Sequence, residues 1–85
     1  MTTPTRYIDL TFLFAEPDEA EAFIDDCSEL DYQTELGEYD GDDERYRWRV
    51  NVTHRLDPQS AAMTSLELTL RSLALRRGGR YAGWA

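Results

Sequence analysis

The strict alternation of side chains over residues 6–15 is the feature that most restricts how this chain folds. Its core-directed positions are Ile8, Leu10, Phe12 and Phe14. A period of two is typical of a β-strand with one buried face. Residues 45–53 repeat the pattern, with core-directed positions at Tyr46, Trp48, Val50 and Val52. Because each strand must bury one face, another layer of structure has to cover that face.

Two other segments carry apolar residues at helical spacing. The first begins at Pro17, which suits the first turn of a helix, and ends near Leu30. Its apolar stripe is Ala20, Phe23, Ile24, Cys27 and Leu30. The second follows Asp57-Pro58, predicted as N-cap and first helical residue, and stops at Gly78-Gly79. Its stripe is Met63, Leu66, Leu70 and Leu73.

Two shorter strands complete the pattern, one at 31–39 and one at 80–84. Asp40-Gly41 is a strong hairpin signal after the first of them. The order strand–helix–strand–strand–helix–strand predicts a ferredoxin-like α+β fold, a four-stranded antiparallel sheet with both helices on one face. The first and third strands are expected in its centre. With 85 residues, the chain is expected to form one domain over 1–85.

The charges divide the chain into an acidic and a basic half. Fourteen carboxylates and no basic residue lie from Glu16 to Glu44, whereas eight arginines face two carboxylates from Arg45 onward. With a net charge of −8, the chain is suited to a basic protein surface and poorly suited to phosphates. The expected partner-binding residues on the first helix are Asp18, Glu21, Asp25, Asp26 and Glu29. The alternative for each single charge is that it only maintains solubility.

The residue types that carry catalysis or bind metals do not form a recognisable site. His54, the one histidine, is in phase with the core-directed residues of its strand and is predicted to be half-buried. Cys27 lies on the apolar stripe of an acidic helix, where a thiolate is disfavoured. The carboxylates at 40–44 lack the spacing of a calcium loop. The sequence therefore predicts a protein that is not an enzyme and needs no metal or cofactor.

The sequence also indicates a compartment. A single cysteine excludes an intrachain disulfide, which fits a reducing environment. The polar start of the chain is unlike a signal peptide, and no stretch approaches the roughly 20 apolar residues of a membrane span. A cytoplasmic protein without a membrane partner is expected.

The segment 78–84 is the most specific motif. It reads Gly78-Gly79-Arg80-Tyr81-Ala82-Gly83-Trp84. This resembles the carboxy-terminal signature of the regulator of ribonuclease activity B family, the RraB-type ribonuclease E inhibitors, in which a glycine pair ends a long helix and leads into Tyr-Asp-Gly-Trp. The pattern of strands and helices is similar over nearly the whole chain. Ala82 departs from the usual aspartate, and Asp31-Tyr32 stands where the family has a glycine before an aromatic residue.

The resemblance implies a ferredoxin-like fold and a non-enzymatic inhibitor of ribonuclease E. Together with the division of charge, it predicts a regulator whose acidic surface binds a basic segment of an RNA-processing enzyme. The motif also has a structural interpretation. Gly78 or Gly79 can end the helix in the left-handed conformation, and Gly83 can form a bulge. Tyr81 and Trp84 can pack on the sheet with a polar atom at its rim. The functional alternative is that an exposed Trp84 anchors the partner.

Other functions remain open. An acidic interaction protein of another kind, such as a toxin-immunity protein, would have the same charge pattern. An RNA-binding module would use a basic stripe on the open sheet face, made of Arg45, Arg47 and Arg49 beside Tyr7 and Asp9. The glycine–aromatic strand motif of such modules is absent, so direct nucleic-acid binding is not expected. These arginines could instead pair with Glu35 across the hairpin, and the open face could pair two copies into a homodimer.

Overall fold

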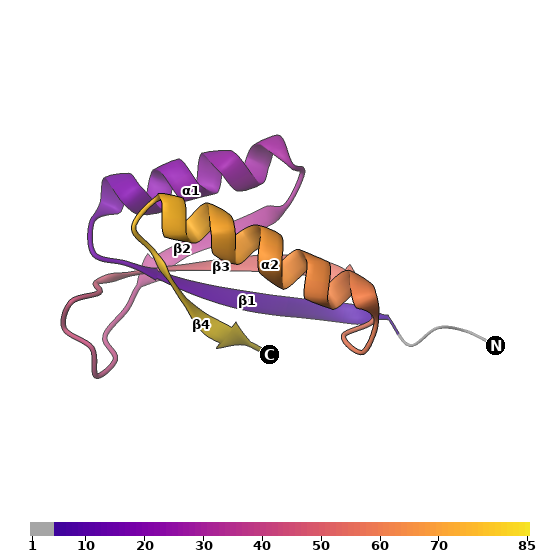
Figure 1. Ribbon diagram of the computed structural model, residues 1–85. Helices are drawn as coiled ribbons and strands as arrows, with labels where there is room; N and C mark the ends of the chain where they lie inside the picture. Colours follow the sequence, from indigo (N-terminus) through magenta and orange to yellow (C-terminus); the bar gives the residue numbers. More distant parts are fainter. Residues whose placement is uncertain (1–4) are drawn as a thin grey trace.

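The strand β1 (Arg6–Phe14) is the centre of the computed structural model, which describes residues 5–85. It pairs antiparallel with β3 (Trp48–Leu56) on one side and with β4 (Arg80–Trp84) on the other. The strand β2 (Gln33–Glu38) pairs with the outer side of β3, which gives the order β2-β3-β1-β4 (Figure 1). The predicted antiparallel sheet is confirmed, with the first and third strands in its centre.

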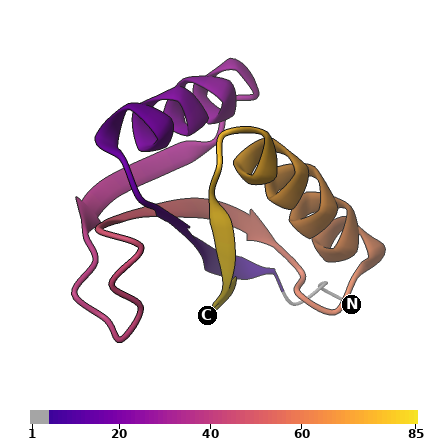
Figure 2. The same cartoon turned by 60° about the vertical axis from the view of Figure 1, so that its left-hand side comes forward.

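Two helices, α1 (Pro17–Glu29) and α2 (Ala61–Arg76), cover one face of the sheet and leave the other face open (Figure 2). With the order βαββαβ, this arrangement confirms the predicted ferredoxin-like fold. Pro17 is the first residue of α1, as its fixed φ favours. The side chain of Glu19 accepts a hydrogen bond from the Glu16 amide at 3.2 Å, which satisfies a free donor at the start of the helix.

The core lies between the sheet and the helices. The predicted core residues of β1 are Ile8, Leu10, Phe12 and Phe14, and all four are completely buried. The ring centroid of Phe23 in α1 lies 4.9 Å from that of Phe12 and 5.2 Å from that of Phe14. Aromatic pairs at this separation add to the free energy of burial, so these rings hold α1 on the sheet. The residues Met63, Leu66, Leu70 and Ala74 of α2 complete the core.

The start of α2 differs from the sequence prediction. The helix begins at Ala61 with Ser60 at the N-cap, so the prediction that Asp57-Pro58 starts it is wrong. The carboxylate of Asp57 accepts a hydrogen bond from the Gln59 amide at 2.9 Å, and its carbonyl accepts one from the Ser60 amide at 3.0 Å. Asp57 therefore stabilises a turn before the helix, which uses the same side-chain chemistry as a cap.

The connection between β2 and β3 is also longer than predicted. The strand predicted to begin at Arg45 begins at Trp48, and residues 39–47 form a loop in place of a tight turn at Asp40-Gly41. Both the amide and the guanidinium of Arg45 donate hydrogen bonds to the carboxylate of Asp43, at 3.2 and 2.9 Å. This local interaction competes with strand pairing, so Arg45 remains in the loop.

Replacing Phe23 with alanine should lower the free energy of unfolding by about 3–5 kcal/mol, because the ring contacts both Phe12 and Phe14. Urea denaturation followed by circular dichroism measures this change. Leu75→Ala in α2 is the control, since Leu75 is 75% exposed, and should change the same quantity by less than about 0.5 kcal/mol. Equal losses in the two variants would contradict the role assigned to Phe23.

Candidate protein-interaction site

The outer side of α1 is a row of carboxylates, called here the acidic ridge. It consists of Asp18, Glu21, Asp25 and Glu29, all exposed. These positions recur at three- and four-residue spacing, which places them on the side of the helix opposite the buried Phe23 and Cys27. Along the helix they span about 16 Å, at a rise of about 1.5 Å per residue. None of the four takes part in an ion pair within residues 5–85.

Asp26, which was predicted together with these residues, lies toward α2. Its carboxylate accepts two hydrogen bonds from the guanidinium of Arg77, at 2.8 and 2.9 Å, and its side chain is 19% exposed. The hydrogen bond from Arg77 holds the pKa of Asp26 below its usual value, although burial acts in the opposite direction. Asp26 therefore joins the two helices and is not part of the acidic ridge.

The glycine pair of the motif at 78–84 lies where the chain leaves α2. Gly78 has a φ of 81°, a conformation that glycine adopts without strain. A Cβ atom on Gly79 would collide with the ring of Phe14, so this position must be small for the chain to turn back onto the sheet. These contacts give both glycines the predicted structural role at the end of the helix.

Tyr81 fixes β4 against α2. Its ring centroid is 5.1 Å from that of Phe12, and its hydroxyl donates a hydrogen bond to Glu67 at 2.9 Å. Burial is the main cause that raises the pKa of Tyr81, and the hydrogen bond to Glu67 adds to it. The tyrosine thus has an apolar body in the core and a polar atom at the rim, as its structural interpretation predicts.

Trp84 lies on the side of the molecule that carries β4, opposite the edge strand β2. It is 39% exposed, and the guanidinium of Arg6 lies 5.5 Å from its ring centroid. Gly83 beside it has a φ of 105° where the pairing of β1 with β4 shifts register. Because β4 packs with α2 and the acidic ridge is on α1, the structure does not bring Trp84 together with the ridge.

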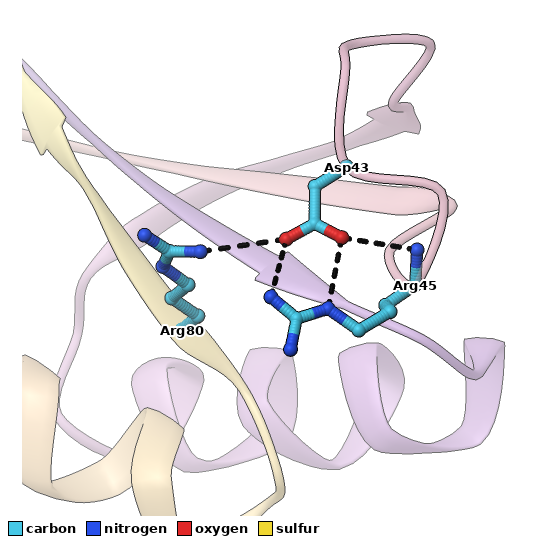
Figure 3. Close-up of polar contacts among 3 residues, drawn as sticks. All are labelled: Asp43, Arg45 and Arg80. Atoms are coloured by element: carbon cyan, nitrogen blue, oxygen red, sulfur yellow. Dashed lines mark hydrogen bonds and ion pairs between the residues drawn. The ribbon is translucent and has the colours of Figure 1, made fainter.

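Asp43 binds two arginines on the open face of the sheet. Its carboxylate lies 2.8 Å from the guanidinium of Arg45 and 3.4 Å from that of Arg80, so the β2–β3 loop reaches across β1 to β4 (Figure 3). Of the predicted basic stripe, Arg49 alone belongs to β3. Glu35, considered as a partner for these arginines, forms no ion pair in the part of the chain that the structure describes.

His54 and Cys27 are both packed into the structure. The half-buried ring of His54 contacts Tyr32 edge-on, with centroids 5.1 Å apart. Cys27 is completely buried, and burial, together with the charge of Asp26, raises the pKa of its thiol to about 12. A thiol that stays protonated is a poor nucleophile.

Across residues 5–85, no group of three or more His, Cys, Asp and Glu residues could hold a metal ion. Neither described helix is long and apolar enough to cross a membrane.

The fold and the motif define a class of small α+β protein, in which an acidic helix and a glycine-terminated helix cover one face of a sheet. A family model described as RraB, regulator of ribonuclease activity B, matches residues 2–85. The chain therefore belongs to the RraB family, and the resemblance seen in the motif is confirmed. Among curated proteins, no match to the chain is found. Regulation of ribonuclease activity, the role in the family's description, fits a protein that acts by binding.

The carboxyl group of Asp43 should titrate at a pH well below the pKa of an ordinary aspartate. Hydrogen bonds from Arg45, followed by the charges of Arg45 and Arg80, lower its pKa to about 2, against about 3.9 in an unfolded chain. The pKa of Asp43 is lower in the folded protein than in the unfolded chain. The contact therefore stabilises the fold above about pH 4, and this stabilisation is lost as the pH falls through about 2. Carbon-13 NMR of the carboxyl group measures the titration.

The chemical shifts of the Arg80 guanidinium should follow the same transition, because the carboxylate of Asp43 lies against this group. In the control variant Asp43→Asn, the shift of Arg80 should stay constant over that range. A midpoint near the ordinary aspartate value would contradict the ion pair.

Proposed function

We propose that this protein is a cytoplasmic inhibitor of a ribonuclease of the ribonuclease E type, and that it acts by binding a basic segment of the enzyme with the acidic ridge of α1. The observation that carries the proposal is the ridge itself. Its carboxylates are Asp18, Glu21, Asp25 and Glu29, exposed and outside every ion pair of the described residues. Membership of a family that regulates ribonuclease activity supports the choice of partner.

Inhibition follows from competition for positive charge. A segment of a ribonuclease that binds RNA must neutralise phosphates with arginine or lysine. A row of carboxylates on a rigid helix can occupy the same side chains, and no catalysis by the inhibitor is needed. Opposite charges would speed the encounter of the two proteins, and added salt would weaken it.

Three alternatives have less support. A toxin-immunity protein would use the same ridge, but the family points to a ribonuclease. An RNA-binding module would need free arginines on the open face of the sheet. Arg45 and Arg80 are already bound to Asp43 there, which leaves less positive charge for phosphates. For an enzyme, the buried and protonated thiol of Cys27 offers no nucleophile.

Neutralising Asp18, Asp25 and Glu29 with Asp18→Asn, Asp25→Asn and Glu29→Gln should weaken binding to the ribonuclease about tenfold. The estimate assumes that each exposed ion pair contributes roughly 0.5 kcal/mol and that about 1.4 kcal/mol equals tenfold. Fluorescence anisotropy with the purified enzyme measures the dissociation constant, and cleavage of a labelled RNA measures inhibition.

The matched control removes three charges from the β2–β3 loop with Asp40→Asn, Asp42→Asn and Glu44→Gln. This control has the same net charge as the helix variant but leaves the acidic ridge intact. It should therefore reduce binding much less. If the two triple variants bind equally well, net charge and not the acidic ridge determines the affinity, and the proposed surface is wrong.

A further inference from the structure

The two edges of the sheet are built differently. β4 has five residues, and its pairing with β1 shifts register beside Gly83, which has a φ of 105°. Short strands and bulges are devices that protect an edge from pairing with another chain. β2 has six residues, contains no proline, and keeps one register with β3 from Gln33 to Glu38. Its edge is similarly short but lacks the irregularity that protects β4.

The pairing of β2 with β3 shows which backbone groups face the free edge. The amide of Tyr39 donates a hydrogen bond to the carbonyl of Arg47 at 2.8 Å, just beyond the end of β2. In an antiparallel ladder, hydrogen-bonded and non-hydrogen-bonded pairs alternate. The residues bonded to β3 are therefore Gln33, Glu35 and Gly37. The residues whose amide and carbonyl groups face outward are Thr34, Leu36 and Glu38. Within residues 5–85, no strand pairs with this outer side.

The side chains of β2 determine which strand could pair there. Glu35 and Glu38 are exposed, and Leu36 is 40% exposed on the sheet face that carries the helices. A second copy of this chain, paired through the same edge, would bring these carboxylates close to their own equivalents, which is unfavourable. A cationic segment with some apolar residues would instead meet opposite charge beside the glutamates and an apolar contact at Leu36.

We propose that the free edge of β2 binds an extended, arginine-rich segment of the partner protein as an additional strand of the sheet. The inference rests on the proposed function, because it describes how the basic segment is held. Backbone hydrogen bonds to Thr34, Leu36 and Glu38 add to the affinity provided by the acidic ridge, and Glu35 and Glu38 select for positive charge. The acidic ridge of α1, on the helix that packs beside β2, steers the segment to this edge.

The test uses the full chain labelled with nitrogen-15 and a synthetic peptide of about ten residues in which arginine and valine alternate. Amide hydrogen exchange is followed by NMR with and without the peptide. The amides of Thr34, Leu36 and Glu38 should exchange rapidly in the free protein and at least about tenfold more slowly with the peptide bound. The amides of Gln33, Glu35 and Gly37 should be protected in both states.

Leu36→Pro tests the same contact by a second route. It removes an amide that faces the free edge, where proline is tolerated because the ladder to β3 keeps all its donors. Loss of this hydrogen bond should weaken binding of the peptide about fivefold to tenfold. The control Leu36→Ala keeps the amide and should bind more tightly than the proline variant. Thermal unfolding establishes that both variants are folded, and the exchange experiment on the unaltered chain does not depend on them.

The proposal is overturned if the peptide does not bind, or if it binds without slowing exchange at Thr34, Leu36 and Glu38. A different result would also overturn the proposal. If these amides are protected without the peptide, and the protection increases with protein concentration, the edge pairs with a second copy of the chain. The proposed function is measured separately by ribonuclease inhibition. A protein that inhibits the enzyme while the β2 amides stay unprotected would retain that function and lose only this mode of binding.

Discussion

Phe23 projects from α1 onto the two aromatic rings of β1, and this contact sets the rotation of the helix about its own axis. Once Phe23 points into the core, every other position of α1 has a fixed direction because the helix repeats every 3.6 residues. Ala20 and Cys27 are buried beside it, and the acidic ridge necessarily faces solvent. The aromatic contact and the charged surface are thus two results of one helical periodicity.

The ion pairs of the molecule use part of its acidic and basic halves to hold segments that are distant in the sequence. Arg77 fixes the end of α2 to α1 through Asp26, and Arg80 fixes β4 to the β2–β3 loop through Asp43. Exposed pairs of this kind contribute little to the free energy of unfolding, so their main effect is on position. The carboxylates without an ion pair in residues 5–85 lie mainly on α1, on β2 and in the β2–β3 loop, which explains how a division of charge in the sequence becomes a charged surface.

Most of the fold could be predicted because its signals are local and repeated. The alternation in β1 and the helical spacing from Ala20 to Cys27 each identify both an element and its buried face. The errors arose where one side chain had two possible uses. Asp57 accepts hydrogen bonds in a turn as readily as in a helix cap, and Arg45 binds Asp43 instead of continuing β3. The helical repeat already turns Asp26 away from the acidic ridge, but its ion pair with Arg77 depends on where α2 ends, which no pattern within α1 encodes.

The position of β1 in the sheet has a consequence for synthesis of the protein. Its residues leave the ribosome before those of its partners on either side, β3 and β4, which are separated from it by much of the chain. Until the segment that follows α2 has been made, one side of β1 lacks its hydrogen-bonding partner and part of its apolar face is uncovered. Strands in this state are prone to aggregate. The abundant carboxylates of α1 and β2 emerge directly behind β1, and their mutual repulsion between nascent chains would keep those chains apart while folding is incomplete.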